Sequence, residues 1–245
     1  MIVKLMQWNI WAKEKPENIA NFLQKNDADI ICAQEIVKDS RIGLDAAKYI
    51  AQILSFEHCY QDGDTWNNRQ DKEAQGNAIF SRFPIIKSDH YYVQDPKHNP
   101  PDSSHEGRVY VEALVKVGNK KLIIGTTHLS HSNGHIITRS RKREADILLG
   151  ILKKKKGDYV FAADLNSTPE SYPVKKIEKI LLHSGPDYSQ KTWTTKPSDP
   201  KNPAEKKLNL RLDYIYASKD IKVMSSEILE CPYSDHLPIL IKFEI

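Results

Sequence analysis

The chain has 245 residues, of which 40% are hydrophobic and 28% are charged. These values are typical of an ordinary soluble globular chain with a large core, and we expect one domain over residues 1–245. No run of about 18 apolar residues occurs, so we expect neither a signal peptide nor a membrane span. The formal net charge of +4 suits an anionic partner, although many proteins without such a partner share it.

The three cysteines, Cys32, Cys59 and Cys231, are widely spaced and form no metal-ligand pattern. Cys32 lies in an apolar run and is interpreted as a core residue. An odd number of cysteines without a disulfide framework favours a reducing compartment. We therefore expect a cytoplasmic protein, and we expect it to be a monomer.

The first half of the chain mixes strands with amphipathic helices. Strand-forming residues and alternating or continuous apolar positions predict strands over residues 2–8, 29–34, 56–60, 77–82 and 85–93. Apolar spacing predicts helices over residues 16–26 and 43–54. Two polar stretches with several Gly, Asn or Pro residues predict long loops over residues 61–76 and 94–107.

The second half begins with a hairpin, because Gly118-Asn119 is a strong turn signal between strands at 108–117 and 120–127. Helices are predicted over residues 136–156 and 170–182, on either side of a strand that ends at Asp164. A Lys- and Pro-rich loop over 195–210 precedes strands at 212–217, 221–229 and 237–243. Many strands, several hairpins and fewer helices indicate two packed sheets with helices outside, a mixed α/β sandwich.

Polar side chains stand at the predicted ends of these strands. They comprise four carboxylates, two histidines and three amides: Asn9, Glu35, Asn77, His128, Asp164, Asn166, Asp213, Asp235 and His236. Strand ends of two stacked sheets can converge on one edge, where polar chemistry is usually mounted. We therefore expect these groups to share one site.

This inventory fits a phosphate together with a divalent cation. Glu35 with Asn9 or Asp235 offers oxygen ligands to a hard cation. The amides and His128 offer donors to a phosphate, and Asp164 or a histidine can accept a proton from water. Because the sequence has no Gly-x-Ser-x-Gly elbow or Cys/His pair, metal-assisted phosphoester hydrolysis is favoured over acyl transfer.

Seven motifs in this order resemble the endonuclease/exonuclease/phosphatase superfamily: Gln7-Trp8-Asn9-Ile10, Gln34-Glu35-Ile36, Gly76 to Arg82, Thr127-His128-Leu129, Ala163 to Asn166, Arg211 to Ile215, and Ser234 to Ile239. The resemblance spans residues 7 to 239. It implies a DNase I-like four-layer αββα sandwich, with two mixed β-sheets packed face to face and helices outside. It also implies a Mg²⁺- or Mn²⁺-dependent hydrolase that works by in-line attack of water on phosphorus.

The resemblance also implies roles for individual residues. The metal ligands would be Glu35, with Asn9 close to it and Asp235 as a second contributor. The remaining roles would be as follows: Asp164 orients and deprotonates the water, Asn166 holds water or phosphate, His236 contacts the scissile phosphate and is oriented by Asp213, and His128 steadies the phosphate or leaving oxygen. Either Asp164 or the His236–Asp213 pair would take the proton.

Several other residues have two interpretations each. Asn77 is a candidate phosphate contact at a position that varies in the family, and Arg108 either reaches a phosphate or lies on a solvated rim. Tyr214 and Trp193 either pack or wall the site, and Trp66 either anchors its loop or stacks on a base or lipid headgroup.

Two groups of basic residues were weighed in the same way. His98, His105, His131 and His135 match no zinc spacing and are assigned to the surface. Lys196, Lys201, Lys206 and Lys207 form a solvated loop or follow a nucleic-acid backbone.

Three functions were compared. The first is a nuclease or DNA-repair phosphodiesterase, which the motifs, the basic balance and the absence of an export signal favour. Where abasic-site endonucleases usually carry an Asn-rich stretch, this chain has Thr127 to His131, which looks like the DNase-like, sphingomyelinase-like and tyrosyl-DNA phosphodiesterase-like branches. The second is a sphingomyelinase-like or inositol-phosphate hydrolase acting on lipid headgroups or small phosphoesters. The third, a binding module with a dead site, is disfavoured because the inventory is complete.

Overall fold

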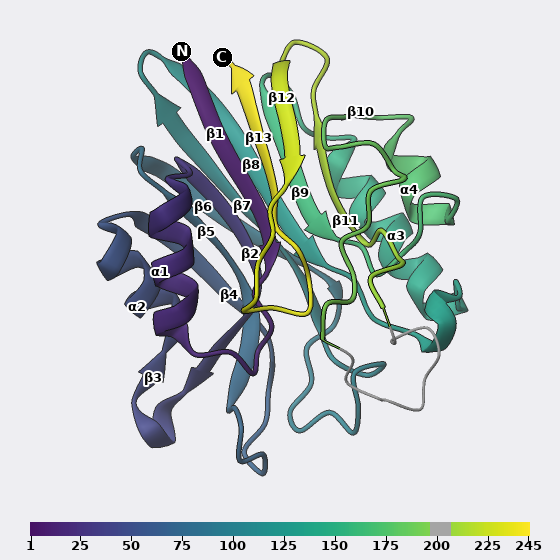
Figure 1. Ribbon diagram of the computed structural model, residues 1–245. Coiled ribbons are helices and arrows are strands. Elements are labelled where there is room, and N and C mark those ends of the chain that lie inside the picture. The colour runs from purple at the N-terminus through teal and green to yellow at the C-terminus, as the bar shows by residue number, and fades with distance from the viewer. Residues whose placement is uncertain (197–206) are drawn as a thin grey trace.

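Two β-sheets stack face to face in the computed structural model, which describes residues 1–196 and 207–245 (Figure 1). The first sheet contains, in spatial order, β12 (Lys222–Ile228), β13 (Ile239–Glu244), β1 (Ile2–Asn9), β2 (Ile30–Asp39), β5 (Ala74–Ser81) and β4 (Glu57–Thr65), with β3 (Leu44–Asp45) paired to β2. The second contains β10 (Leu182–His183), β11 (Asp213–Ala217), β9 (Tyr159–Asp164), β8 (Lys120–His128), β7 (Arg108–Val117) and β6 (Ile85–Gln94).

Helices cover the outer faces of both sheets. Helices α1 (Pro16–Asn26) and α2 (Ala46–Leu54) lie on the first sheet, and α3 (Arg139–Leu152) and α4 (Tyr172–Ile177) lie on the second (Figure 1). Short 3-10 helices span Ser40–Ile42 and Asn133–His135. Because β1 runs parallel to β2 and β8 parallel to β9 while the other strand pairs are antiparallel, both sheets are mixed, and the expected αββα sandwich is confirmed. No helix in the two described ranges is both long and apolar enough to cross a bilayer.

The side chains that face each other between the sheets change from apolar to polar along each central strand. On β1 they are Val3 and Leu5 and then Gln7 and Asn9. Four more strands follow the same gradient: Ile30, Cys32 and Gln34 on β2; Leu122, Ile124, Thr126 and His128 on β8; Val160, Ala162 and Asp164 on β9; and, in reverse direction, Ala217, Ile215 and Asp213 on β11. Because one face of a strand repeats every two residues, the register brings these polar residues to one end of the inter-sheet layer.

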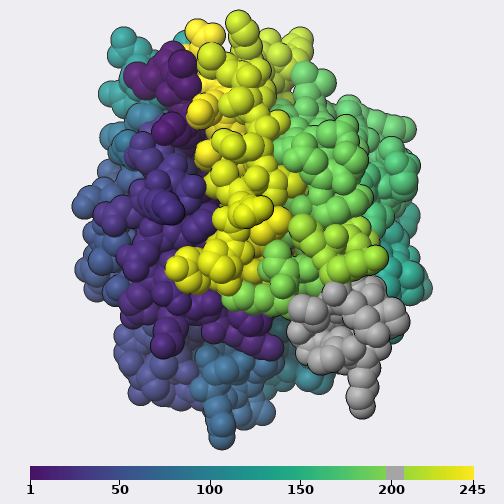
Figure 2. Space-filling view, viewed as in Figure 1, coloured from purple at the N-terminus to yellow at the C-terminus, as the bar shows by residue number. Residues whose placement is uncertain are grey.

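The end of β1 and the loop before β13 meet at this polar end. Strand β1 pairs with β13, and in Figure 2 the C-terminal segment lies between the N-terminal segment and the segment that precedes it. Trp8 Nε1 donates to the carbonyl oxygen of His236 at 3.1 Å, and Ser234 Oγ donates to the carbonyl oxygen of Asn9 at 2.6 Å. These bonds fix the loop before β13 against the end of β1.

The prediction that Glu35 stands at the end of a strand is wrong, because Glu35 lies inside β2. Strand β2 continues to Asp39, and its register against β5 shifts between Ala33 and Ile36. Glu35 has a φ of 60° at this β-bulge. A bulge inserts an extra residue and redirects a side chain, which frees Glu35 from the alternation of the sheet. Asn77 likewise lies inside β5 rather than at its end.

Other predicted boundaries also move. Half of the predicted loop over 61–76 is strand, because β4 continues to Thr65 past a bulge and β5 begins at Ala74. Its polar composition concealed this, since β4 is an edge strand of the sheet. The helices are shorter than predicted at capped ends: the Asp45 side chain accepts from Lys48 N before α2, and the Thr138 side chain accepts from Arg141 N before α3. Helix α4 ends at Ile177, and residues 197–206 of the predicted loop, with Lys201 and Lys206, lie outside the described residues.

Gly76 is required where β5 passes close to β4. A Cβ built at Gly76 would lie 1.9 Å from the carbonyl oxygen of Gln61. We expect Gly76→Ala to lower the free energy of unfolding by about 3 kcal/mol, because backbone must move to relieve the overlap. Urea denaturation measures this change. Gly150 in α3 has no heavy atom within 4 Å of its built Cβ, so the control Gly150→Ala should raise the free energy of unfolding by about 0.5–1 kcal/mol. A Gly76→Ala protein as stable as wild type would contradict this packing.

Candidate active site

The polar end of the inter-sheet layer opens into a pocket of about 380 Å³. Eight of the residues predicted for the site line it: Asn9, Glu35, Arg108, His128, Asp164, Asn166, Asp235 and His236. Asp213 lies behind His236, to which it is hydrogen-bonded. These groups come from positions 9 to 236 of the sequence, so the expected convergence on one rim is what the fold produces.

Asp164 is the centre of the pocket's hydrogen-bond network, and it is fully buried at the end of β9. Its carboxylate accepts from Asn9 Nδ2 at 3.0 Å and from the backbone N–H of Asn166 at 2.8 Å. The Nε2 atoms of His128 and His236 lie 3.3 and 3.7 Å from Asp164 Oδ2. Asp164 thus occupies a position from which it can take a proton from a molecule in the pocket.

His236 is held by a carboxylate behind it. Its Nδ1 lies 2.8 Å from Asp213 Oδ2, and Asp213 Oδ1 accepts from Gln7 Nε2 at 3.0 Å. Burial alone would lower the pKa of His236, but the charges of Asp213, Asp164 and Asp235 outweigh burial and raise the pKa well above its usual value. His236 is therefore an imidazolium that directs its Nε2 toward the pocket, which suits a donor to an anion.

His128 has the opposite electrostatics. Burial lowers its pKa to about 4, despite the nearby carboxylate of Asp164. The neutral ring lies with Nε2 2.9 Å from Asn166 Nδ2, which also donates to the carbonyl oxygen of Leu129 at 2.9 Å. Asn166 has a φ of 46°, a conformation that asparagine tolerates better than most residues. This turn after β9 fixes the Asn166 amide beside Asp164 and His128.

Two further carboxylates, Glu35 and Asp235, face the pocket with opposite pKa shifts. Burial alone would raise the pKa of Glu35, but the charge that His128 carries once protonated at acidic pH, hydrogen bonds to the carboxylate and the charge of Lys72 hold it at about 2. Those bonds come from Asn9 Nδ2 at 3.0 Å and the backbone N–H of Ala12 at 2.9 Å. Burial and the charge of Glu35 raise the pKa of Asp235 to about 6. Two half-buried carboxylates that repel one another form a donor set that a divalent cation would neutralise.

A second group also has the composition of a metal site. One ligand atom each from Asp164, Asp213 and His236 lies within 4.8 Å of the others. In this group, however, His236 Nδ1 already bonds Asp213, and a protonated imidazole cannot coordinate a cation. The Glu35 and Asp235 pair therefore fits a hard cation better than the group around His236 does.

Arg108 and Asn77 are both more enclosed than the sequence had indicated. The Arg108 side chain is only 6% exposed and forms an ion pair with Glu106 at 2.9 Å, so the interpretation as a solvated rim is wrong. It lines the pocket beside His128. Asn77 is buried and donates from Nδ2 to the carbonyl oxygen of Val109 at 2.8 Å, and it does not line the main pocket. In this structure the Asn77 side chain therefore supports the backbone of β7.

Of the three aromatic candidates, two are packed in the interior and one lines the pocket. Tyr214 is packed in the core, and Trp66 is 2% exposed, as expected of a loop anchor. Trp193 lines the pocket and its Nε1 donates to Asp235 Oδ2 at 3.3 Å. His135 is buried and lines the pocket, so its assignment to the surface is wrong, whereas His131 also lines the pocket but is exposed, as predicted.

Sequence reasoning missed three polar residues that build the site. Lys72 lines the pocket, is 7% exposed and donates to Gln75 Oε1 at 2.6 Å. Arg141 of α3 is buried, contacts the carbonyl oxygen of Asn166 and donates to Ser167 Oγ at 2.7 Å. Gln7 holds Asp213 from the first strand. Only Gln7 carried a local signal, since it occupies a core-facing position on an otherwise apolar strand.

Comparison with known proteins concerns the family and the fold. A model of the endonuclease/exonuclease/phosphatase family matches residues 6–236. Comparison with curated proteins yields no match. Among solved structures, an endonuclease/exonuclease/phosphatase from Beutenbergia cavernae has a TM-score of 0.80 and 16% identity, and the match covers 100% of this chain and 72% of that chain.

Two further solved structures are similar. A mannosyl-6-phosphatase from Bacteroides thetaiotaomicron has a TM-score of 0.70 and 15% identity, with coverage of 99% of this chain and 100% of that chain. The D. rerio TDP2 complexed with single strand DNA product has a TM-score of 0.73 and 16% identity, with coverage of 100% and 99%. These likenesses show a shared fold.

Proposed function

The chain belongs to the endonuclease/exonuclease/phosphatase family, and on that premise we propose that it is a divalent-metal-dependent phosphodiesterase acting on nucleic acid. The observation that carries the proposal is the meeting of Glu35, Asp164 and the Asp213–His236 pair in one pocket. The pocket combines a carboxylate that can bind a cation, a buried carboxylate that can accept a proton, and a positively charged imidazole that can donate a hydrogen bond. These are the parts that hydrolysis of a phosphodiester needs.

Glu35, Asn9 and Asp235 would hold Mg²⁺ or Mn²⁺, because they supply the oxygen ligands these ions prefer. When bound, the ion neutralises developing charge on phosphorus and lowers the pKa of water. Glu35 is suited to this role because its carboxylate is ionised at any pH above about 2.

The remaining residues act on the water and the phosphate. Asp164 accepts the proton of the attacking water, and Asn166 orients that water or a phosphate oxygen. His236 donates from Nε2 to a non-bridging oxygen, while Asp213 keeps the ring charged and aligned. Neutral His128 and the Arg108 guanidinium lie in the same pocket to steady the phosphate or the leaving oxygen.

Nucleic acid is the proposed substrate class for two reasons. Besides the His236 imidazolium, the pocket is lined by three cationic side chains, Lys13, Lys72 and Arg108, in a chain with a net charge of +4. In addition, TDP2, which shares the fold, has been crystallised with a single strand DNA product. A lipid substrate is less well supported, because Trp66, the aromatic candidate for membrane insertion, is buried.

A substrate panel tests this proposal. With Mg²⁺ or Mn²⁺ added, we expect cleavage of single-stranded oligonucleotides and of a chromogenic phosphodiester, but not of sphingomyelin. Binding of an oligonucleotide should weaken steeply with salt, by about tenfold or more between 50 and 200 mM, because neutralised phosphates release counterions. Fluorescence anisotropy on the inactive Asp164→Asn protein measures this affinity. Binding that is insensitive to salt, with cleavage of small esters only, would contradict a nucleic-acid substrate.

A further inference from the structure

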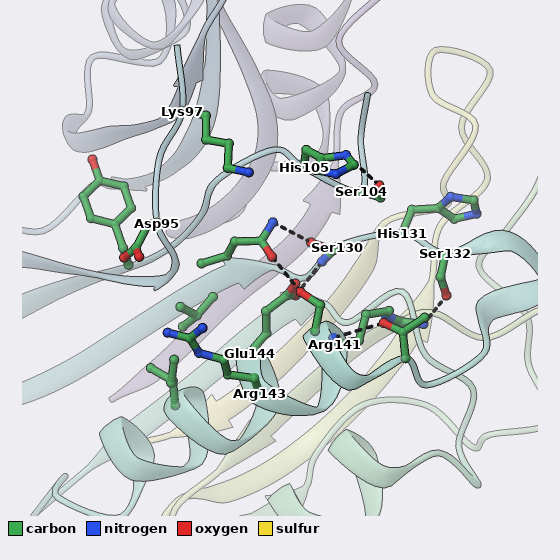
Figure 3. Close-up of a pocket in the computed structure, with 16 residues that line it drawn as sticks. Asp95, Lys97, Ser104, His105, Ser130, His131, Ser132, Arg141, Arg143 and Glu144 are labelled. Carbon is green, nitrogen blue, oxygen red and sulfur yellow. Dashed lines mark hydrogen bonds between the residues drawn. The ribbon is translucent and has the colours of Figure 1, made fainter. Parts of the chain in front are cut away.

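A second cavity adjoins the candidate active site. It has a volume of about 500 Å³ and lies among the β6–β7 connection, the segment after β8 and helix α3 (Figure 3). His131 lines both this cavity and the catalytic pocket, and the neighbouring residues Ser103 and Ser104 line one each. A molecule extending from the catalytic pocket past His131 would enter the second cavity. Its volume is in the usual range for a ligand site.

A buried carboxylate lines this cavity with one oxygen unpaired. Glu144 is 1% exposed, and its Oε2 accepts from the backbone N–H of Ser130 at 3.0 Å. Its Oε1 has no hydrogen-bond partner among residues 1–196 and 207–245. Buried polar atoms are nearly always satisfied, and the neighbouring Arg141 guanidinium, whose Nε is also unpaired, offsets the Glu144 charge without bonding this oxygen, so Oε1 has room for one further donor. A hydroxyl or an amino group would supply it.

The rim of the cavity carries cations from two different elements. Lys97 comes from the β6–β7 connection and Arg143 from α3, and both are labelled in Figure 3. Both side chains are exposed, and neither forms an ion pair with another described residue. Asp95 adds one carboxylate to the rim, which leaves the exposed charge positive. This positively charged rim suits a phosphate, while Glu144 Oε1 inside the cavity suits a hydrogen-bond donor.

One residue, Arg141, connects the wall of the cavity to the turn that contains Asn166. Arg141 lines the cavity and also donates to the carbonyl oxygen of Leu165 at 3.2 Å and to Ser167 Oγ at 2.7 Å. The same guanidinium donates to Ser132 Oγ at 3.0 Å. A ligand in the cavity would therefore contact the Arg141 side chain, which holds the turn containing Asn166.

We propose that this cavity is a second substrate subsite, which binds the nucleotide next to the scissile phosphate of a single nucleic-acid strand. A sugar hydroxyl or base amino group donates to Glu144 Oε1, and the outer phosphate lies between Lys97 and Arg143. The inference rests on the proposed function, because it concerns the same substrate. It adds that a strand with an outer phosphate binds better than a minimal diester.

Substrate length provides the test. We compare a chromogenic phosphodiester, a dinucleotide with one phosphodiester and a tetranucleotide, all with Mg²⁺ and the full chain. For wild type we expect kcat/KM to rise by about tenfold from dinucleotide to tetranucleotide, mainly through KM. The double variant Lys97→Ala/Arg143→Ala should lose this gain and retain wild-type kcat/KM for the chromogenic diester. Glu144→Gln should reduce the gain for oligonucleotides in the same selective manner.

Lys142→Ala is the matched control. Lys142 lies on the same helix, pairs with Asp146 at 2.7 Å and lines neither cavity, so its loss should leave the length dependence intact. If the double variant keeps the tenfold gain, or loses activity equally on every substrate, the subsite is wrong while the proposed function stands. If wild type cleaves the chromogenic diester but no oligonucleotide, the nucleic-acid proposal and the subsite both fail.

Discussion

Replacing Asp164 with asparagine is expected to lower kcat by about 10³-fold with little change in KM. The carboxylate is buried and lies 3.3 and 3.7 Å from the Nε2 atoms of His128 and His236, and the amide cannot accept a proton. The backbone N–H of Asn166 can still donate to the amide oxygen, so the turn after β9 should persist. Steady-state kinetics on the chromogenic diester measure the loss.

Glu35→Gln is the comparison that separates loss of the base from loss of the metal. Both variants should be nearly inactive, but only Glu35→Gln should lose the rise in melting temperature that Mn²⁺ gives to the wild-type protein, since a ligand stabilises the state that binds it. Asp164→Asn should keep that rise. Near-wild-type kcat in Asp164→Asn would remove this residue from the proposed chemistry. An equal loss of the Mn²⁺ effect in both variants would instead make Asp164 a metal ligand.

Sequence patterns predicted the site well where the geometry follows from alternation along a strand. Asn9, His128 and Asp164 end strands whose inward-facing residues are apolar until the last one or two positions. Once the sheets stack, such ends must meet, so local pattern and motif order were enough. The confirmed membership of the family follows from the same motifs.

The features that escaped prediction depend on contacts between distant parts of the sequence. Glu35 was predicted as a site residue, but its position at a bulge inside β2 was not, because a bulge is set by the pairing of two strands, here β2 and β5. Lys72 looked like part of a polar loop because its burial comes from packing against the ring of Trp66, with Nζ 4.6 Å from the ring centroid. Arg141 looked like one of several cations on an amphipathic helix. Only its contacts with the Asn166 turn distinguish it from Lys142 and Arg143.

The change from apolar to polar side chains along the inter-sheet layer places the stabilising core at one end and the candidate active site at the other. At one end, interlocking Val, Ile and Leu side chains form the core that holds the sheets together. At the other, Gln7 donates to both Gln34 Oε1 at 2.8 Å and Asp213, and Gln34 donates to Thr126 Oγ1 at 2.9 Å. This buried amide chain satisfies most of its polar groups, with Gln7 Oε1 left without a partner among the described residues, and it fixes the carboxylate behind His236.

The Asp213–His236 pair therefore predicts a second large effect, with a distinct pH signature. Asp213→Asn should lower kcat by about 10²- to 10⁴-fold, because the ring loses both its alignment and the charge that keeps it protonated. In wild type the raised pKa of His236 keeps the donor protonated, so activity falls only as pH rises through that pKa. Without the Asp213 charge the pKa falls, and the alkaline limb of the pH–rate profile should move to lower pH.

Gln7→Leu is the matched variant for this pair, since it removes a hydrogen bond to Asp213 while leaving its charge in place. We expect a smaller loss in kcat and an alkaline limb close to that of wild type. The profile of kcat against pH, with stability checked by thermal unfolding at each pH, distinguishes the two variants. If Asp213→Asn lowers kcat without moving the alkaline limb, the charge of His236 does not contribute to the rate, and Asp213 acts only by holding the ring in place.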